Sequence, residues 1–283
     1  MPGHPRVGAH CGGGLSGALT RAQEIGAECL QVFASAPQQW RSPAHTAEDI
    51  IAFCEACAAA GIGPLLLHGI YLLNFASPVE ANLKRSIGSL RAHLEWADLA
   101  GAIGVVFHPG SAGADPYEEA ERRVVGGLAD ILAVRDGPAR VIIETCAGQG
   151  ATIGRSFEEI ARLLGALNAD RRVGVCIDTC HLFAAGYDLV GGGSARRVVD
   201  EFDRIVGLDR LVCIHANDSR TAKGSNVDRH ANIGDGQIGE DVFHELLTDP
   251  RLRHVPFYLE VPGSGDGPDR INVDALKRLR GDR

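Results

Sequence analysis

An aspartate and a histidine stand two residues apart in the stretch NVDRHANIGDGQIG (226–239), which is too rich in glycine and charge for a helix or a buried strand. This pair, Asp228 and His230, is well spaced to chelate a metal ion. Other histidines and carboxylates stand at the ends of short apolar runs: His68, His108, Glu144, Asp178, His181, His215 and Glu260. Imidazole and carboxylate donors without thiolate suit zinc or manganese. These residue types predict a metal centre, provided that the fold brings them together.

The apolar runs that carry these residues have the character of strands buried on both faces. They are continuous rather than alternating in polarity, and stretches with helical spacing separate them. The expected strands lie within residues 6–10, 29–34, 64–69, 104–110, 140–146, 173–181, 211–218 and 255–263. The expected helices cover 46–61, 80–100, 117–135, 194–206, 240–248 and 273–280, with a further helix opening at Ser156. This alternation predicts an α/β fold, a single (β/α)8 TIM barrel over residues 1–283 as one domain, with a doubly wound open sheet as the alternative.

A barrel of this kind explains why the strand ends matter. Its parallel strands all end on one face, and active sites form there. A single histidine at a strand end is ordinarily a hydrogen-bonded core group, but so many polar groups together would each cost about 2 kcal/mol or more to desolvate without partners. Bound cations remove that cost. The number of candidate ligands predicts more than one ion, and ions about 3.5–4 Å apart are typical of phosphoester hydrolysis.

Composition limits the remaining possibilities. The chain has 283 residues, of which 45% are hydrophobic, and it contains no apolar run as long as the roughly 20 residues of a membrane helix. The start, MPGHPRVGAH, lacks the apolar core of a signal peptide, so we expect a cytoplasmic protein without a membrane partner. Its cysteines are dispersed and suit reduced thiols, and the CxxC of Cys54 and Cys57 lies in a helical pattern. The net charge of −8, taken alone, argues against a nucleic-acid partner.

Three long motifs outweigh that argument. ETCAGQG (144–150), IDTCHLFAAGYD (177–188) and HANDSRTAKGSNVDRHANIGDGQIG (215–239) resemble the endonuclease IV family of apurinic/apyrimidinic endonucleases. HGIYLLNFASP (68–78), GAH (8–10) and APQQW (36–40) extend the resemblance over nearly the whole chain. It implies a single zinc-dependent barrel, a monomer, that acts in DNA repair on double-stranded DNA containing abasic sites or blocked 3′ ends.

The resemblance also implies a ligand set for three Zn²⁺ ions per chain, with Mn²⁺ in part of the sites as an alternative. His68, His108 and Glu144 would hold the first ion. Glu144 would bridge to a second ion, which Asp178, His215 and Glu260 also bind. His181, Asp228 and His230 would hold the third. Three Zn²⁺ ions would bring the formal net charge from −8 to −2.

The reaction implied by the resemblance is hydrolysis of the phosphodiester 5′ to the abasic sugar. A metal-activated hydroxide would attack the phosphorus, with Glu260 and Glu144 as the catalytic carboxylates, and leave a 3′-hydroxyl and a 5′-deoxyribose phosphate. The family also removes blocking groups from 3′ ends. Tyr71 and Leu72 match its wedge into the base stack, although such residues are ordinarily loop-packing groups.

The sequence departs from the family's usual pattern where the family meets DNA. The loop after GAH reads CGGGLSGAL and is shorter, Gln38 replaces an arginine that reaches into the minor groove, and Ile70 stands where proline or a small polar residue is common. We therefore expect Gln38 to weaken DNA contact, with the metal chemistry intact. His10 is at a strand end but is not a family ligand, and we expect it to support the site; Trp40 is expected to pack.

Two other functions remain open at this point. A sugar isomerase or epimerase on a related barrel would use Glu144, Asp178, His215 and Glu260, with one or two ions, and would leave His181, Asp228 and His230 without a role. A non-catalytic barrel would bind lesions or metals without turnover. A metal content near three per chain favours the nuclease over the isomerase.

Overall fold

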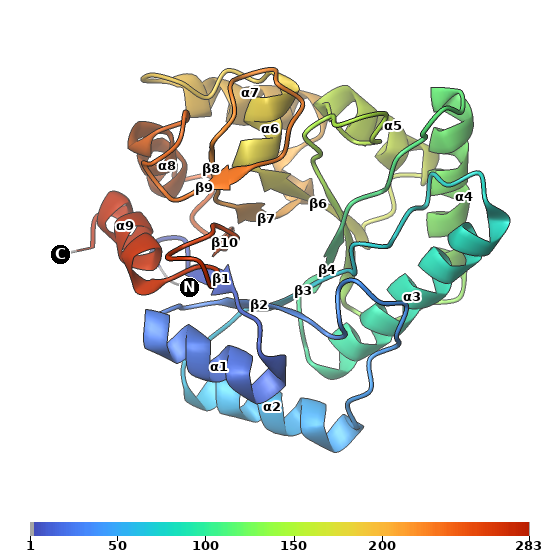
Figure 1. The fold of residues 1–283 in the computed structure, drawn as a ribbon, viewed down its shortest axis with the longest axis horizontal. Helices are drawn as coiled ribbons and strands as arrows, with labels where there is room; N and C mark the ends of the chain where they lie inside the picture. Colours follow the sequence, from blue (N-terminus) through green and yellow to red (C-terminus); the bar gives the residue numbers. More distant parts are fainter. Residues whose placement is uncertain (1–2, 283) are drawn as a thin grey trace.

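Strand β1 closes a parallel barrel by pairing with both β2 and β10, as the computed structural model shows for the described residues 3–282 (Figure 1). The order around the barrel is β1-β10-β7-β6-β5-β4-β3-β2. Its strands are β1 (Val7–His10), β2 (Leu30–Phe33), β3 (Leu65–His68), β4 (Gly104–Phe107), β5 (Arg140–Glu144), β6 (Val173–Asp178), β7 (Leu211–His215) and β10 (Phe257–Leu259). The expected TIM barrel is thus confirmed, and the open sheet is excluded for these residues.

Helices surround the strands on the outside (Figure 1). They are α1 (Gly14–Ile25), α2 (Ala47–Ala59), α3 (Glu80–Leu99), α4 (Tyr117–Ala133), α5 (Phe157–Ala166), α6 (Thr179–Ala185), α7 (Ser194–Ile205), α8 (Glu240–Thr248) and α9 (Arg270–Arg280), with a 3-10 turn η1 (Leu208–Arg210). Thr46 forms the predicted capping box with Asp49, and the Ser156 hydroxyl accepts from the Glu159 amide. None of the helices within residues 3–282 is long and apolar enough to cross a membrane.

Two helices were not predicted. Helix α1 begins at Gly14, the last glycine of CGGG, a run that has low helix propensity and reads as loop. Helix α6 starts directly from β6, inside the run that was expected to continue as a strand to residue 181. Asp178 ends the strand because its side chain caps the helix, accepting a hydrogen bond from the His181 amide at 2.9 Å.

The inside of the barrel is a packed core. Cys29, Leu66, Val106, Ile142, Cys176, Cys213 and Tyr258 form one buried cluster, and a larger apolar cluster lies between strands and helices. Gly8 is required where β1 meets β2, since a Cβ there would lie 1.8 Å from the Cys29 carbonyl oxygen. All cysteines are free thiols, and Cys54 and Cys57 lie in α2 as expected.

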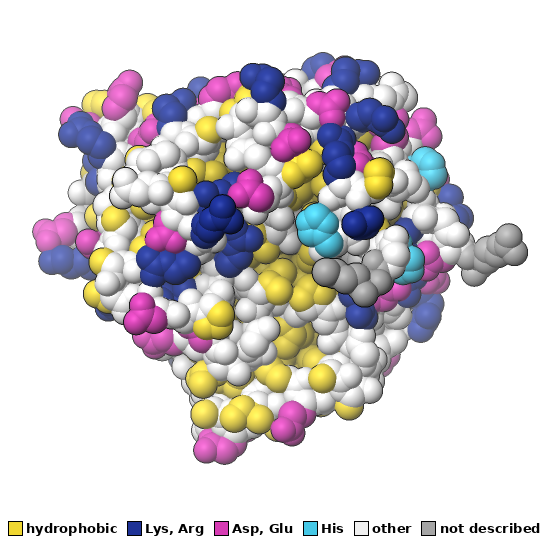
Figure 2. Space-filling view, turned by 180° about the vertical axis from the view of Figure 1, so that it is seen from behind, with side chains coloured by type: hydrophobic (Ala, Val, Ile, Leu, Met, Phe, Trp, Pro, Cys, Tyr) yellow, Lys and Arg dark blue, Asp and Glu magenta, His cyan; other side chains and the backbone are white. Residues whose placement is uncertain are grey.

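Charged side chains are interspersed over the face turned away in Figure 1, as Figure 2 shows. Basic and acidic groups both occur over the part of this face that is described. This face therefore carries charges of both signs.

Candidate metal centre

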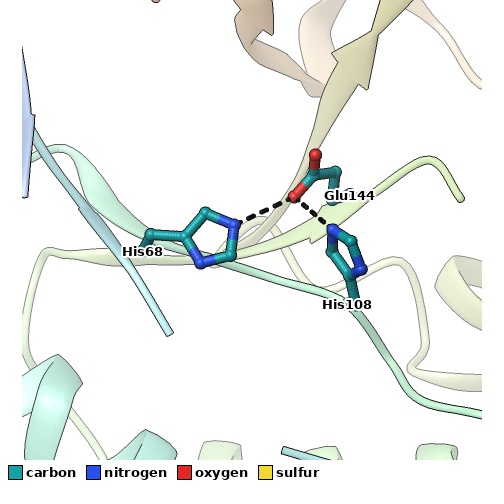
Figure 3. A group of neighbouring side chains, drawn as sticks. All are labelled: His68, His108 and Glu144. Atoms are coloured by element: carbon teal, nitrogen blue, oxygen red, sulfur yellow. Dashed lines mark ion pairs between the residues drawn. The ribbon is translucent and has the colours of Figure 1, made fainter. Parts of the chain in front are cut away.

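The first group of candidate ligands is built around one buried carboxylate oxygen. His68 at the end of β3 and His108 just after β4 both point their Nε2 atoms at Glu144 Oε2, at 3.3 and 3.0 Å (Figure 3). Glu144 ends β5 and is fully buried. The two dashed contacts in Figure 3 converge on a single atom from two different strands. One carboxylate oxygen with two imidazole nitrogens around it is a set of ligand atoms that can hold a divalent cation.

The second group uses the other oxygen of the same carboxylate. His215, at the end of β7, places Nδ1 2.9 Å from Glu144 Oε1, 3.4 Å from Glu260 Oε2 and 3.9 Å from Asp178 Oδ2. The ligand atoms of these four residues lie within 4.8 Å of one another. Glu144 therefore belongs to both groups, and it is the residue to which the family resemblance assigns a bridging role.

The third group depends on the long excursion of the chain after β7, residues 216–239, which ends where α8 begins. Asp228 lies between two histidines: its Oδ2 is 3.1 Å from His181 Nε2 and its Oδ1 is 3.1 Å from His230 Nε2. Asp178 Oδ2 is 3.6 Å from His230 Nε2, so this aspartate also adjoins the second group. Cys180 lies near Asp228 and His230, which the sequence did not indicate. Burial and the charge of Asp178 raise the pKa of its thiol to about 12, so it is a weak ligand.

A short antiparallel hairpin, β8 (Asp218–Ser219) and β9 (His230–Ala231), holds this excursion against α6 (Figure 1). The buried Asp218 carboxylate then fixes the glycine-rich stretch beyond it. It accepts hydrogen bonds from the backbone amides of Ser219, Gly234, Gly236, Ile238 and Gly239. A Cβ at position 236 would lie 2.3 Å from Asp218 Oδ1. The glycines of GDGQIG thus let the backbone wrap around a carboxylate and position His230 beside the barrel.

Backbone carbonyls orient three of the histidines. The Nδ1 atoms of His68, His181 and His230 lie 2.7, 2.9 and 3.1 Å from the carbonyl oxygens of Gly69, Thr145 and Glu260, respectively. A carbonyl only accepts, so Nδ1 carries the proton in each ring. The Nε2 lone pair of each ring then faces the ligand groups, as metal binding requires.

Several buried polar atoms at this site lack hydrogen-bond partners within the described chain: Glu144 Oε2, His181 Nε2 and His230 Nε2. Glu144 Oε2 nevertheless lies 3.3 and 3.0 Å from the Nε2 atoms of His68 and His108, and the Nε2 atoms of His181 and His230 each lie 3.1 Å from a carboxylate oxygen of Asp228. Unpartnered buried polar groups are costly, by about 1–3 kcal/mol each. Divalent cations between these atoms would satisfy them, so the residues fit the metals that the sequence predicts.

The pKa values of the histidines also favour a site for cations. Burial lowers the pKa of His215, but the charges of Glu260 and Glu144 outweigh it and raise the pKa to about 10. Burial lowers the pKa of His230 as well, but the charge of Asp178 and the hydrogen bond that the ring donates to Asp228 outweigh it, and the pKa rises to about 9. The chain without metal therefore holds extra protons here, because the carboxylates create a field that attracts positive charge. Divalent cations would take the place of those protons.

Two neighbours of the ligands escaped the sequence analysis. The Asn217 side chain donates to Asp178 Oδ2 at 2.7 Å and accepts from the Glu260 amide at 2.8 Å. Gln31, buried in β2, contacts both Glu260 and His215. His10 Nδ1 lies 3.1 Å from Glu260 Oε1, in agreement with its expected supporting role. The one available signal for Gln31 was a polar residue inside the apolar run CLQVFA.

A hollow of about 430 Å³ opens over the ligands, and Tyr71, Arg220, Arg229 and Pro262 line its rim together with ligand residues. Tyr71 is 64% exposed and packs its ring edge-on to Phe33, whereas Leu72 is half-buried against the core. The Tyr71 amide donates to the Pro37 carbonyl at 2.9 Å, so the loop with exposed Gln38 adjoins Tyr71. The sequence analysis did not single out Arg220 or Arg229, which are both exposed.

Ile70 and Trp40 complete the positions that the sequence marked. Ile70 is buried and belongs to the apolar core, so this departure from the family pattern is a packing change. Trp40 is 38% exposed, which is more than its expected packing role implies.

Comparison with known proteins shows which family of barrels this chain resembles. A family model described as a xylose isomerase-like TIM barrel matches residues 19–281. A relative from Streptomyces coelicolor named "Probable endonuclease 4" is 41% identical over 286 residues, covering 99% of this chain and 96% of the relative. The solved structure of endonuclease IV from Thermus thermophilus has a TM-score of 0.83 and 36% identity, covering 97% of this chain and 98% of that one.

Sugar-converting barrels are more distant. A D-tagatose 3-epimerase-like protein superimposes with a TM-score of 0.71 at 17% identity, covering 97% of this chain and 94% of that one. This likeness shows a shared fold alone.

Proposed function

This chain belongs to the endonuclease IV family, a metal-dependent group of deoxyribonucleases, and on that premise we propose that it hydrolyses the phosphodiester 5′ to abasic sites in duplex DNA. The products are a 3′-hydroxyl and a 5′-deoxyribose phosphate. The same site removes blocking groups from 3′ ends, since both reactions hydrolyse a phosphoester next to a deoxyribose. The protein works as a cytoplasmic monomer.

The observation that carries this proposal is the gathering of the candidate ligands into three groups, with Glu144 shared between two of them. His68, His108 and Glu144 hold one Zn²⁺; Glu144, Asp178, His215 and Glu260 hold a second; and His181, Asp228 and His230 hold the third, with Mn²⁺ accepted at part of these positions. When bound, such ions supply an activated water at neutral pH and neutralise the charge of the reacting phosphate.

Glu260 is the carboxylate best placed to orient the attacking water. Its Oε1 is held by Gln31 at 2.5 Å and by His10 at 3.1 Å, whereas Oε2 faces the ligand group. The side chain is 16% exposed and lines the hollow, so it reaches both the buried ligands and an incoming phosphate. Glu144, by contrast, is fully buried and holds its two neighbouring groups at a fixed separation.

Recognition of the lesion falls to the rim of the hollow. An abasic nucleotide has no base pair to break, so it is the least costly one to turn out of the helix. Tyr71 wedges into the gap, and Leu72 anchors its loop on the core. Arg220 and Arg229 are placed to contact phosphates beside the lesion, and Gln38 faces the groove next to Tyr71.

Incision of a duplex with one tetrahydrofuran abasic analogue tests the proposal, since this analogue cannot undergo β-elimination. The assay omits magnesium and is repeated after prolonged chelation. Cleavage 5′ to the analogue that is lost on stripping and restored by zinc is the expected result. No cleavage by a chain that carries a single metal ion would favour the sugar isomerase instead. Cleavage on the 3′ side would contradict the proposed products.

A further inference from the structure

Gln31 is the one neutral polar side chain on β2 that enters the metal centre, and it is 0% exposed. Its amide lies between two of the proposed ligands. Nε2 is 2.5 Å from Glu260 Oε1, and Oε1 is 2.8 Å from His215 Nε2. Nε2 also lies 2.9 Å from His10 Nδ1. A buried glutamine with both ends engaged is held in one orientation, because a flip would break each contact.

The chemistry of its neighbours fixes which way the amide points. The Glu260 carboxylate has only acceptor atoms when ionised, so the amide nitrogen must face it and donate. The amide oxygen then faces His215 and can only accept. His215 must therefore carry a proton on Nε2. That leaves Nδ1 as the ring nitrogen directed at Glu144, Glu260 and Asp178.

This orientation makes His215 an exception within the site. Backbone carbonyls hold His68, His181 and His230 through Nδ1, and those rings present Nε2 to the ligand groups. His215 presents Nδ1 instead, and its partner is a side chain. A side-chain partner can be removed by substitution, whereas a backbone carbonyl cannot. The tautomer of His215 can therefore be changed by substituting Gln31.

We propose that Gln31 is a positioning residue for the metal centre: it keeps the proton of His215 on Nε2, so that Nδ1 is the nitrogen that binds the metal. The same amide holds Glu260 Oε1 and leaves Oε2 for the ligand group. One residue thereby sets the donor atoms of two ligands of the second ion. This inference rests on the metal-dependent function proposed above, and it adds a residue that neither the metal-ligand set nor the DNA-contacting set contains.

The direct test is the tautomer of His215 in the zinc-loaded full chain. Two-bond ¹H–¹⁵N correlation spectra of protein labelled in its histidine rings distinguish a proton on Nε2 from one on Nδ1, and the spectrum of His215→Asn assigns the signal. We expect the proton on Nε2. A proton on Nδ1 in the unsubstituted protein would overturn the inference, whatever the variants do.

Two substitutions of Gln31 separate its hydrogen bonding from its volume. Gln31→Met keeps the length and removes the acceptor. We expect one bound zinc to be held about 10–100-fold more weakly, measured by competition with a chromophoric chelator, and the His215 signal to lose its single Nε2–H form. Gln31→Glu restores an acceptor, so the Nε2 proton should return. An unchanged zinc affinity and tautomer in Gln31→Met would contradict the inference.

A matched control removes a comparable partner from a histidine outside the site. Ser35 Oγ lies 3.3 Å from Nε2 of the buried His93, so Ser35→Ala should leave zinc affinity unchanged. Urea unfolding of each chelated variant reports on folding alone. If the unsubstituted protein bound no zinc, the proposed function itself would be wrong, and this inference with it. If it bound zinc and Gln31→Met bound it equally well, only the role of Gln31 would be wrong.

Discussion

Asp178 and His181 are joined by a helix cap: Asp178 Oδ1 accepts the His181 amide at 2.9 Å, while Oδ2 turns toward the ligand groups, 3.6 Å from His230 Nε2. One carboxylate thus starts α6 and contributes to the centre. The cap fixes the position of His181 relative to the end of β6, so the histidine reaches the third group without any loop of its own.

Substitution of Asp178 should separate these two roles. Asp178→Asn retains a capping oxygen but loses the charge, whereas Asp178→Ala loses both. We expect both variants to lose zinc, measured as metal per chain. Only Asp178→Ala should also lower the free energy of unfolding of the chelated chain, by about 1 kcal/mol, in urea titrations. Equal stabilities for the two chelated variants would show that the cap contributes nothing.

Glu260→Gln should separate turnover from binding. The amide cannot accept a proton from water, so we expect incision of the tetrahydrofuran duplex to fall by about 10²-fold or more. Lesion binding should largely survive, because the rim residues are untouched. Fluorescence anisotropy with the same duplex measures it. Parallel loss of turnover and binding would mean that Glu260 mainly holds the site together.

Gln38→Arg should tighten binding to abasic duplex, since it restores a positive charge on the loop beside Tyr71. One added phosphate contact would steepen the dependence of log affinity on log salt by about 0.9. Gln23→Arg adds the same charge on the exposed side of α1 and serves as the control. An equal gain from both variants would indicate general attraction rather than a contact by this loop.

The pair of Glu28 and Arg280 should make the stability of the barrel depend on pH. Partial burial raises the pKa of Glu28, but hydrogen bonds from Arg280 and the Val7 amide outweigh it and hold the pKa below its ordinary value. A depressed folded-state pKa contributes stability that is present above the unfolded pKa of about 4.3 and is lost as the pH falls through the folded value.

Glu28→Gln should therefore destabilise the chelated chain by about 1 kcal/mol at pH 7, after allowance for solvent screening. The difference from the unsubstituted chain should shrink below about pH 4. Urea titrations at several pH values measure it. A difference that stays constant down to pH 3 would mean that the charge of Glu28 is not its source.

The sequence predicted the barrel, because buried parallel strands leave continuous apolar runs, and it placed seven candidate ligands at the ends of those runs and Asp228 and His230 outside any expected strand. It missed α6, since the capping residue Asp178 reads as the last residue of a strand. It also missed the role of Gln31. A polar residue within an apolar run does not reveal its partner, and His215 lies 184 residues away along the chain. The Arg220 and Arg229 positions depend on the hairpin geometry, which leaves no periodic signal.

The glycine-rich stretch is held in place by Asp218 rather than by the barrel strands. The metal centre therefore has two parts that differ in the free energy needed to open them. The first and second ligand groups lie at or directly after barrel strands, and they persist for as long as the barrel is folded. Asp228 and His230 lie on an excursion that can open locally, at a smaller free energy than global unfolding. Chelators should therefore empty the centre in sequence, from the excursion inward, and a partly stripped chain would be a distinct species with an intact barrel.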